Sequence, residues 1–310
     1  MAAFAKKRRR FLSVTRKRDL KGLLFLFPWI VGFSLFFMSP LCQSALFSLN
    51  KITITAKGRR MNFVGFDNYI DIFQRDIYFT ERLGNFFANT LFSLPVILVF
   101  SLLIAMLINQ KIRGKGIFRA IFFLPIIVVS GPVMNMLVQE GATTIPLIEQ
   151  YGIYDVIWQI PMFLQEPIYY LFSQLIMILW YSGVPILIFL AGLQKIDHTL
   201  YEAALIDGAS SWVVFWKITL PSLRNMILIN AIYSLVFLAT SEINEVIILI
   251  RNSMLEPDRG YGIASAMAWS YSMGIAISIG LIYLIIGREK KAKDQKAIIY
   301  RKRSMASYAK

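Results

Sequence analysis

Two carboxylates in an apolar part of the chain have the clearest capacity for chemistry. Glu242 and Glu245 are the only acidic side chains within the six membrane spans predicted below. A carboxylate in hydrocarbon costs roughly 3 kcal/mol unless it faces a cavity or a partner. On a continuous helix, residues three apart project from one face. The pair could therefore bind a polar solute on a path through the membrane, or act as an acid and a base.

Few other side chains could support catalysis. The chain has one histidine, His198, and one cysteine, Cys42, so we expect no metal site and assign no catalytic residue. No GxxxxGK[ST] phosphate loop occurs, so we expect neither ATP hydrolysis by this chain nor a bound cofactor. A membrane-embedded enzyme that uses Glu242 and Glu245 is an alternative, but binding and transport are favoured.

The elements that must position these carboxylates are membrane helices. Of the 310 residues, 57% are hydrophobic and 16% are charged, whereas about 25% of a soluble domain is charged. A helix needs about 20 mostly apolar residues to cross a bilayer. The sequence therefore predicts an all-α, polytopic membrane protein with six transmembrane helices in a domain over 23–286. The six predicted spans are 23–47, 87–109, 117–139, 168–193, 225–250 and 262–286.

The basic residues predict the orientation of these spans. The net charge is +15, and nine Lys and Arg fall in each of 1–21 and 287–310. Because positive residues are retained on the cytoplasmic side, we place the basic tails 1–22 and 287–310 in the cytoplasm. This places 25 Lys and Arg inside and eight outside. The charge thus predicts contact with membrane lipids and not with nucleic acid. The outer stretches 48–86 and 140–167 are long enough for short interfacial helices.

The segment 195–221 lies between spans 4 and 5, on the cytoplasmic side in this topology. Thr199 and Glu202 have the spacing of a capping box, which predicts the start of a helix. Ala203 and Ala204 would give this helix a small-residue surface that another body can approach closely.

A turn and a second short helix are predicted to follow. Asp207–Gly208 is typical of a helix stop, and Ser210 or Ser211 can cap the second helix, which has an aromatic side. Pro221 is tolerated at the start of span 5. Such a helix pair lies along the membrane surface, and feature by feature an ordinary interfacial linker would look the same.

The order of these motifs resembles a known family. Ile196 to Pro221 read IDHTLYEAALIDGASSWVVFWKITLP, which is similar to the EAA loop of binding-protein-dependent ABC importers. Segments similar to the carbohydrate branch, with its maltose and glycerol-phosphate permeases, are 25–40, Phe63–Tyr69, Asn89–Leu91 and 105–125. Relatives often carry a Phe-Asp pair and a Thr-Gly-Gly-Pro turn where this chain has 241–262. The resemblance therefore does not specify the sugar.

The resemblance implies a type I ABC importer permease fold in the bacterial plasma membrane. It implies pairing with a homologous second permease, docking of two ATPase subunits, and delivery by an extracytoplasmic substrate-binding protein. The loop residues that it implies for ATPase coupling fall in two groups. The docking surface would comprise Glu202, Ala203, Ala204 and Gly208. The return into span 5 would be shaped by Asp207, Ile218, Leu220 and Pro221.

The same resemblance suggests a sugar path beside span 5. On a straight helix Glu242 lies about 7 Å beyond the span's midpoint and Glu245 about 12 Å, so Glu242 is the better functional candidate. We hypothesise that Glu242, Asn244 and Gln174 hydrogen-bond sugar hydroxyls, and that Tyr181 could stack on a sugar ring. Alternatively, these groups pair with the partner permease or a polar loop.

Two other transport classes remain as alternatives. An amino-acid or oligopeptide importer permease would share the loop, but the carbohydrate-like segments argue against it. A secondary transporter usually shows repeated halves, and none is visible here.

Overall fold

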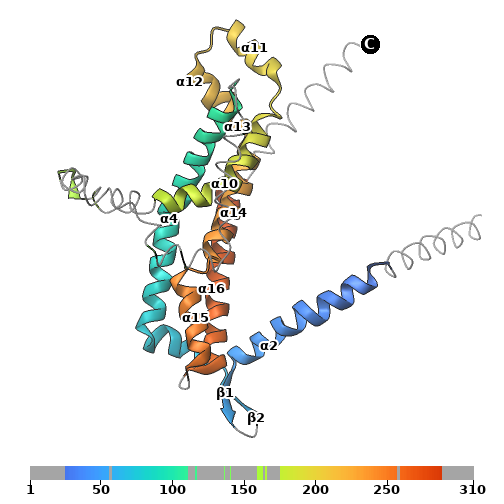
Figure 1. Cartoon of the computed structure of the whole chain (residues 1–310), viewed down its shortest axis with the longest axis vertical. Coiled ribbons are helices and arrows are strands. Elements are labelled where there is room, and N and C mark those ends of the chain that lie inside the picture. Colours follow the sequence, from blue (N-terminus) through green and yellow to red (C-terminus); the bar gives the residue numbers. More distant parts are fainter. Residues whose placement is uncertain are drawn as a thin grey trace, which may run out of the picture. The chain divides into compact units, whose positions relative to one another are not determined.

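The computed structural model describes residues 25–55, 58–110, 116, 136, 140, 159–162, 165, 175–256 and 259–287 (Figure 1). The predicted span 117–139 and loop 140–167 therefore lie almost entirely outside the described residues. The same holds for Gln174, for the tail 1–22 and for the tail after Gly287. The described residues belong to two compact units, which are treated one at a time: residues up to Phe79 with Ile250–Ser270, and Thr80–Leu249 with the residues from Tyr271 on.

The first unit contains the first membrane helix and a β-hairpin. The helix runs over Phe25–Ser48, close to the predicted span 23–47, and it includes η1 (Ser34–Met38) and α2 (Ser39–Ser48). Strands β1 (Asn50–Thr55) and β2 (Gly58–Phe63) follow and pair antiparallel (Figure 1). Two short helices come next: α3 (Asp67–Ile70) and η2 (Asp71–Arg75). The sequence suggested short helices in 48–86 but not the hairpin.

The hairpin is held by one buried amide and by a glycine of α16 (Gly260–Ile282). Asn68 Nδ2 donates to the carbonyl oxygens of Ser48, at 2.8 Å, and Asn50, at 3.1 Å. A Cβ on Gly262 would lie 2.3 Å from the Asn50 oxygen. Because no side chain can occupy that space, the hairpin and the start of α16 can approach this closely only at a glycine.

The second unit is a helical bundle. It contains most of α4 (Ile77–Asn109), α10 (Leu175–Leu193), α14 (Arg224–Ala239) and the end of α16, which continues as η4 (Tyr283–Gly287). Helices α10 and α14 run side by side (Figure 1). Their core includes the fully buried Phe189 and Leu223, packed with Ala105 of α4.

Several helices of the described chain could cross a membrane. Three are long and apolar enough by themselves: Phe25–Ser48, Ile77–Asn109 and Gly260–Gly287. Two bent helix pairs raise this number to five within the described ranges, if each pair is one span. The six-span prediction thus has its third span outside the described residues.

Two predicted span boundaries differ from the structure. Helix α4 begins at Ile77, ten residues before the predicted start at 87. Asp76 precedes it, and its Oδ1 accepts a hydrogen bond from Phe79 N at 3.2 Å, an N-cap that the hydropathy pattern does not reveal. The predicted span 225–250 is wrong as one continuous helix, because α14 ends at Ala239 and α15 (Glu245–Leu255) starts anew.

Candidate functional site

The break between α14 and α15 sets the geometry of the candidate site. Residues 240–244 form turns, so Glu242 lies in the break and Glu245 is the first residue of α15. The expectation that both carboxylates share one helical face is therefore wrong. Non-helical backbone at membrane depth is tolerated where it is buried in protein or lines a cavity. A polar path is therefore expected beside the break.

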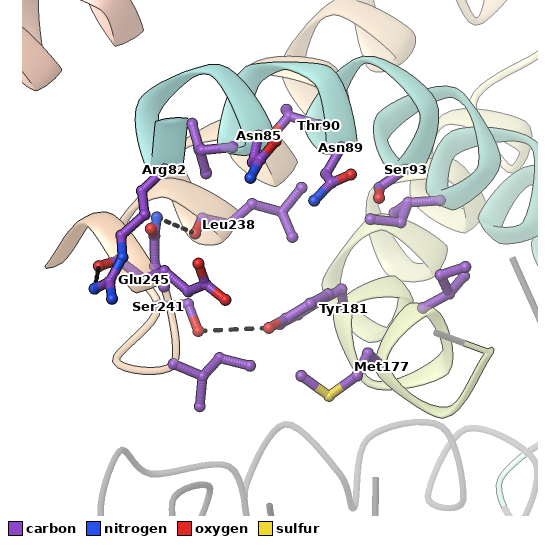
Figure 2. A pocket seen from close by; sticks show the side chains of 15 residues that line it. Arg82, Asn85, Asn89, Thr90, Ser93, Met177, Tyr181, Leu238, Ser241 and Glu245 are labelled. Carbon is purple, nitrogen blue, oxygen red and sulfur yellow. Dashed lines mark hydrogen bonds between the residues drawn. The ribbon is translucent and has the colours of Figure 1, made fainter. Parts of the chain in front are cut away.

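A cavity of about 340 Å³ lies beside this break. Figure 2 shows its walls, which come from α4, α10, the end of α14 and the break itself. The polar residues that line it are Arg82, Asn85, Asn89, Thr90, Ser93, Tyr181, Ser241, Asn244 and Glu245. Small-molecule sites typically measure about 300–1,000 Å³ and carry a few well-placed polar groups. The cavity is therefore large enough for a small polar solute.

The two carboxylates differ in their relation to this cavity. Glu245 is exposed and lines it, whereas the half-buried Glu242 is not among its described lining residues. The preference for Glu242 over Glu245 thus does not match their placement. It depended on a straight helix in which Glu245 would approach the outer interface. The break removes that premise.

A polar stripe on α4 was missed from the sequence. Arg82, Asn85, Asn89 and Ser93 follow one another at steps of three, four and four residues, so they share one helical face toward the cavity (Figure 2). The signal was readable as helical periodicity. It was missed because the predicted span began at 87, which left the first two positions in a supposed loop.

Two predicted path residues lie at the cavity and interact with protein groups. Tyr181 is 7% exposed, and its hydroxyl lies 3.4 Å from Ser241 Oγ (Figure 2). Its ring packs edge-on against Phe237, with centroids 5.4 Å apart. Asn244 lines the cavity too, but its amide is engaged by neighbouring backbone. The structure therefore brings Tyr181, Asn244 and Glu245 together, and Gln174 lies outside the described residues.

The predicted coupling loop forms a chain of short helices. They are α11 (His198–Ile206), α12 (Ser211–Val214), η3 (Phe215–Thr219) and α13 (Leu220–Ser222). Helix α11 bends by 66° from the helix before it, and the α12–α13 segment bends by 65° from α14. Both α11 and α12 lie beyond the end of α10 in Figure 1. Because α12, η3 and α13 follow one another without a break, the loop consists of two helical segments, as predicted.

The cap of α11 differs from the prediction. Its N-cap is Asp197, whose Oδ1 accepts from Thr199 N at 3.0 Å, so the Thr199–Glu202 capping box is wrong. Hydrogen bonds from Thr199 to this carboxylate hold the pKa of Asp197 below its ordinary value. The second cap is confirmed, because Ser210 Oγ accepts from Val213 N at 3.5 Å.

The turn between the two helices needs a glycine. Asp207 ends α11, and Gly208 follows with φ of +72°, which disfavours a residue with a Cβ. Tyr201 Oη lies 3.1 Å from Thr219 Oγ1, which ties α11 to η3. The predicted helix stop at Asp207–Gly208 is confirmed.

The implied docking residues are not equally accessible. Glu202, Ala203 and Gly208 are exposed, but Ala204 is buried and faces the protein. At the return, Ile218 and Leu220 are half-buried, and Pro221 lies in the first turn of α13. Large apolar side chains dominate the exposed surface of the loop, and they include Trp212 and Trp216 of the predicted aromatic side. The exposed apolar residues are Leu200, Leu205, Ile206, Trp212, Val213 and Trp216.

Apolar helices of spanning length, a polar cavity beside a broken helix and an exposed helical loop define a membrane-embedded transport permease. The chain belongs to the binding-protein-dependent transport system inner membrane component family, whose model matches residues 79–288. It is thus a multi-pass membrane subunit of an ABC importer that works with a substrate-binding protein.

Relatives and solved structures agree with this family. The probable ABC transporter permease YesP of Bacillus subtilis is 30% identical, covering 87% of this chain and 90% of its own length. The lactose transport permease LacF of Rhizobium radiobacter is 31% identical, over 72% and 74%. A chain of a bacterial ABC transporter that imports the acidic polysaccharide alginate matches with TM-score 0.58 at 21% identity, covering 90% and 99%, and shares the type I importer fold.

Proposed function

We propose that this permease carries a neutral sugar or short oligosaccharide. The single observation that supports this most strongly is the cavity, whose polar lining residues are mainly neutral hydrogen-bonding side chains. Sugar hydroxyls both donate and accept, and they need such groups at several positions. Relatives named for lactose and for trehalose and maltose transport point the same way.

The charges of the cavity favour a neutral solute. Arg82 and Glu245 are the charged residues among its described lining, so their formal charges cancel. Arg82 Nη1 donates to the backbone oxygen of Glu245 at 3.3 Å, which holds the guanidinium at this wall. A strongly anionic sugar would bring an uncompensated charge into the site, which is costly at low dielectric.

One observation favours a second candidate, an amino-acid importer. A zwitterion needs one cationic and one anionic group in the same site, and Arg82 and Glu245 supply both. Amino acids are therefore tested beside sugars in the hydrolysis assay. The geometry does not favour an enzyme that uses Glu242 and Glu245 as an acid and a base, because Glu245 lines the cavity whereas Glu242 is not among its described lining residues.

We further propose that the loop from α11 to α13 docks on a separate ATPase, with the loop and both termini in the cytoplasm of a bacterial cell. A homologous second permease and two ATPase subunits would complete the transporter. The exposed Glu202, Ala203 and Gly208, with the apolar surface of Leu205 and Ile206, would form the contact. Asp207, Ile218, Leu220 and Pro221 would transmit movement to α14. Exposed apolar surface of this kind is typical of protein interfaces.

Co-purification and ATP hydrolysis test both parts. The chain is co-expressed with the ATPase, second permease and binding protein of its source organism and placed in lipid nanodiscs. Hydrolysis is measured with maltose, lactose, trehalose, arabino-oligosaccharides and amino acids. The Glu202→Lys and Gly208→Pro variants are expected to lose the ATPase, whereas Glu81→Lys, the same charge reversal on an exposed residue of α4, keeps it.

Asn89→Ala tests the cavity, because it removes a lining amide. We expect it to raise the KM for the stimulating sugar at least fivefold, and Asn252→Ala, on the exposed side of α15, to leave it unchanged. Stimulation by amino acids but by no sugar would replace the sugar proposal with the second candidate. Retention of the ATPase by both loop variants would refute the docking proposal.

A further inference from the structure

The side chain of Asn244 is committed to the backbone of the break, although it lies beside the cavity. Its Nδ2 donates to the carbonyl oxygens of Leu238, at 3.4 Å, and Ala239, at 3.2 Å. Its Oδ1 accepts from Val246 N at 2.9 Å. One amide thus closes the carboxyl end of α14 and caps the amino end of α15. These are the backbone groups that a helix break leaves unsatisfied.

Tyr271 of α16 completes this arrangement. Its hydroxyl accepts from Asn244 Nδ2 at 2.6 Å and donates to the Ala239 oxygen at 2.9 Å. Tyr271 is 3% exposed and Asn244 9%. The ring of Tyr271 packs edge-on against Phe86 of α4, with centroids 5.2 Å apart. The break is thus held by Asn244, which lies within it, and by Tyr271 of another helix.

Asn244 and Tyr271 together form a clamp on the break, and side chains that line the cavity lie at both ends of the break. Ser241 lies inside the break and reaches Tyr181, while Glu245 starts α15 at the opposite end. Asn244 N also donates to the Ser241 oxygen at 3.0 Å, so the turn between these groups is closed. With its amide occupied, Asn244 has little capacity left for a solute. Its effect on the cavity must therefore pass through Ser241 and Glu245.

We propose that Asn244 and Tyr271 are positioning residues for substrate recognition. They hold the broken helix so that Ser241 and Glu245 face the solute, and they do not bind it themselves. This inference rests on the proposed function in that the cavity receives the substrate. Loss of the clamp weakens recognition and leaves the ATPase contact of the distant loop intact.

The first experiment measures the geometry of the break without any substrate. Cys42 is the sole cysteine, so Cys42→Ser gives a cysteine-free chain into which Ser241→Cys is placed. Labelling by a methanethiosulfonate reagent is followed in nanodiscs. We expect Asn244→Ala to accelerate labelling about tenfold, because the freed turn exposes the thiol.

Two further variants are expected to accelerate the labelling by intermediate amounts, and a third variant serves as the control. Tyr271→Phe removes the hydroxyl but leaves the contacts of the Asn244 amide with the backbone in place, so it is expected to give a smaller acceleration. Asn244→Ser keeps an acceptor for Val246 N but cannot reach α14, so its rate falls between those of the native chain and Asn244→Ala. Ser272→Ala, at the exposed neighbour of Tyr271, is expected to change nothing.

The second experiment measures recognition through a cycle of variants. Asn244→Ala raises the KM for the transported solute, whereas kcat and the amount of bound ATPase stay near native. In a Ser241→Ala background the same change has a smaller effect, because its action passes through Ser241. If the KM of the double variant rises by the product of the two single-variant increases, the two residues act independently and the positioning role is refuted.

The two experiments separate this inference from the proposed function. Faster labelling in Asn244→Ala supports the clamp even if no sugar or amino acid is transported, and in that case only the proposed function fails. Labelling that is equal in Asn244→Ala, Asn244→Ser and the native background overturns the clamp, whatever the substrate. Because Asn244→Ser preserves the helix cap, it remains informative if Asn244→Ala does not assemble.

Discussion

Gly262→Ala is expected to release the hairpin of the first unit. The new Cβ would lie 2.3 Å from the Asn50 carbonyl oxygen and 3.3 Å from Asn68 Nδ2. Restoring a normal C···O contact of about 3.3 Å requires the strand to move by about 1 Å. That movement weakens both hydrogen bonds from Asn68, each worth about 1 kcal/mol. Residual overpacking adds about 1 kcal/mol or more, for a total of about 3 kcal/mol.

Trypsin cleavage measures this destabilisation directly. The hairpin carries Lys51, Arg59 and Arg60, which are cleaved when it opens. When opening is fast, cleavage follows the population of the open form, so about 3 kcal/mol corresponds to roughly 100-fold faster cleavage. Cut sites are assigned by mass spectrometry of the nanodisc-embedded chain.

Two other glycines of α16 provide matched controls. A Cβ on Gly280 meets nothing within 4 Å, and a Cβ on Gly274 meets the ring of Phe87 at 2.6 Å. Alanine at Gly280 is expected to leave hairpin cleavage unchanged, and alanine at Gly274 to lower thermal stability without exposing the hairpin. Equal cleavage rates for Gly262→Ala and Gly280→Ala would refute the reasoning.

Three predictions concern the loop. Tyr201→Phe removes the contact with Thr219, worth about 1 kcal/mol, and should lower the ratio of substrate-stimulated to basal ATP hydrolysis. Gly208→Ala places a Cβ at φ of +72°, costs about 1–2 kcal/mol and should weaken ATPase co-purification less than proline does. Because the pKa of Asp197 is lowered, its contribution to α11 is present above the ordinary Asp pKa and lost as pH falls through the lowered value. Asp197→Ala should therefore abolish this acid dependence of helicity in a loop peptide, measured by circular dichroism.

The membrane class and the loop could be predicted from the sequence because both depend on local pattern. Long apolar runs determine which segments can cross a bilayer, and Gly208 marks a turn that few other residues permit. The cap of α11 shows the limit of such patterns. Asp197 and Thr199 are both good N-cap residues, and the choice between them depends on backbone angles.

The broken helix was not read from the sequence, because the break is stabilised by Asn244 together with a tertiary contact from Tyr271. Residues 240–244 contain neither proline nor glycine, the usual signals of a helix end. The carbonyls freed at Ala239 are instead satisfied by Asn244 and by Tyr271 of another helix. Hydropathy also placed the start of the predicted span 87–109 too late. The polar face of α4 looks like a loop when only lipid exposure is considered.

The hairpin did have a local signal. Residues 50–63 alternate Ile52 and Ile54 with polar residues and then carry a Gly at position 58, which is typical of two strands joined by a turn. The phenylalanines and tyrosines of 48–86 were instead assigned to interfacial helices. The alternation of apolar and polar residues, considered before composition, would have identified the β-hairpin.

The clamp on the broken helix also dictates an order of assembly in the cell. Helices α14 and α15 have 16 and 11 residues, so each is shorter than the roughly 20 that a bilayer crossing requires. Tyr271 is synthesised 27 residues after Asn244, roughly 1–5 s later at ribosomal rates. During that interval the polar turn has no hydroxyl from α16 to satisfy it. We therefore expect α14 and α15 to reach their final packing only after α16 is present, and chains truncated before Tyr271 to be degraded faster than the full chain.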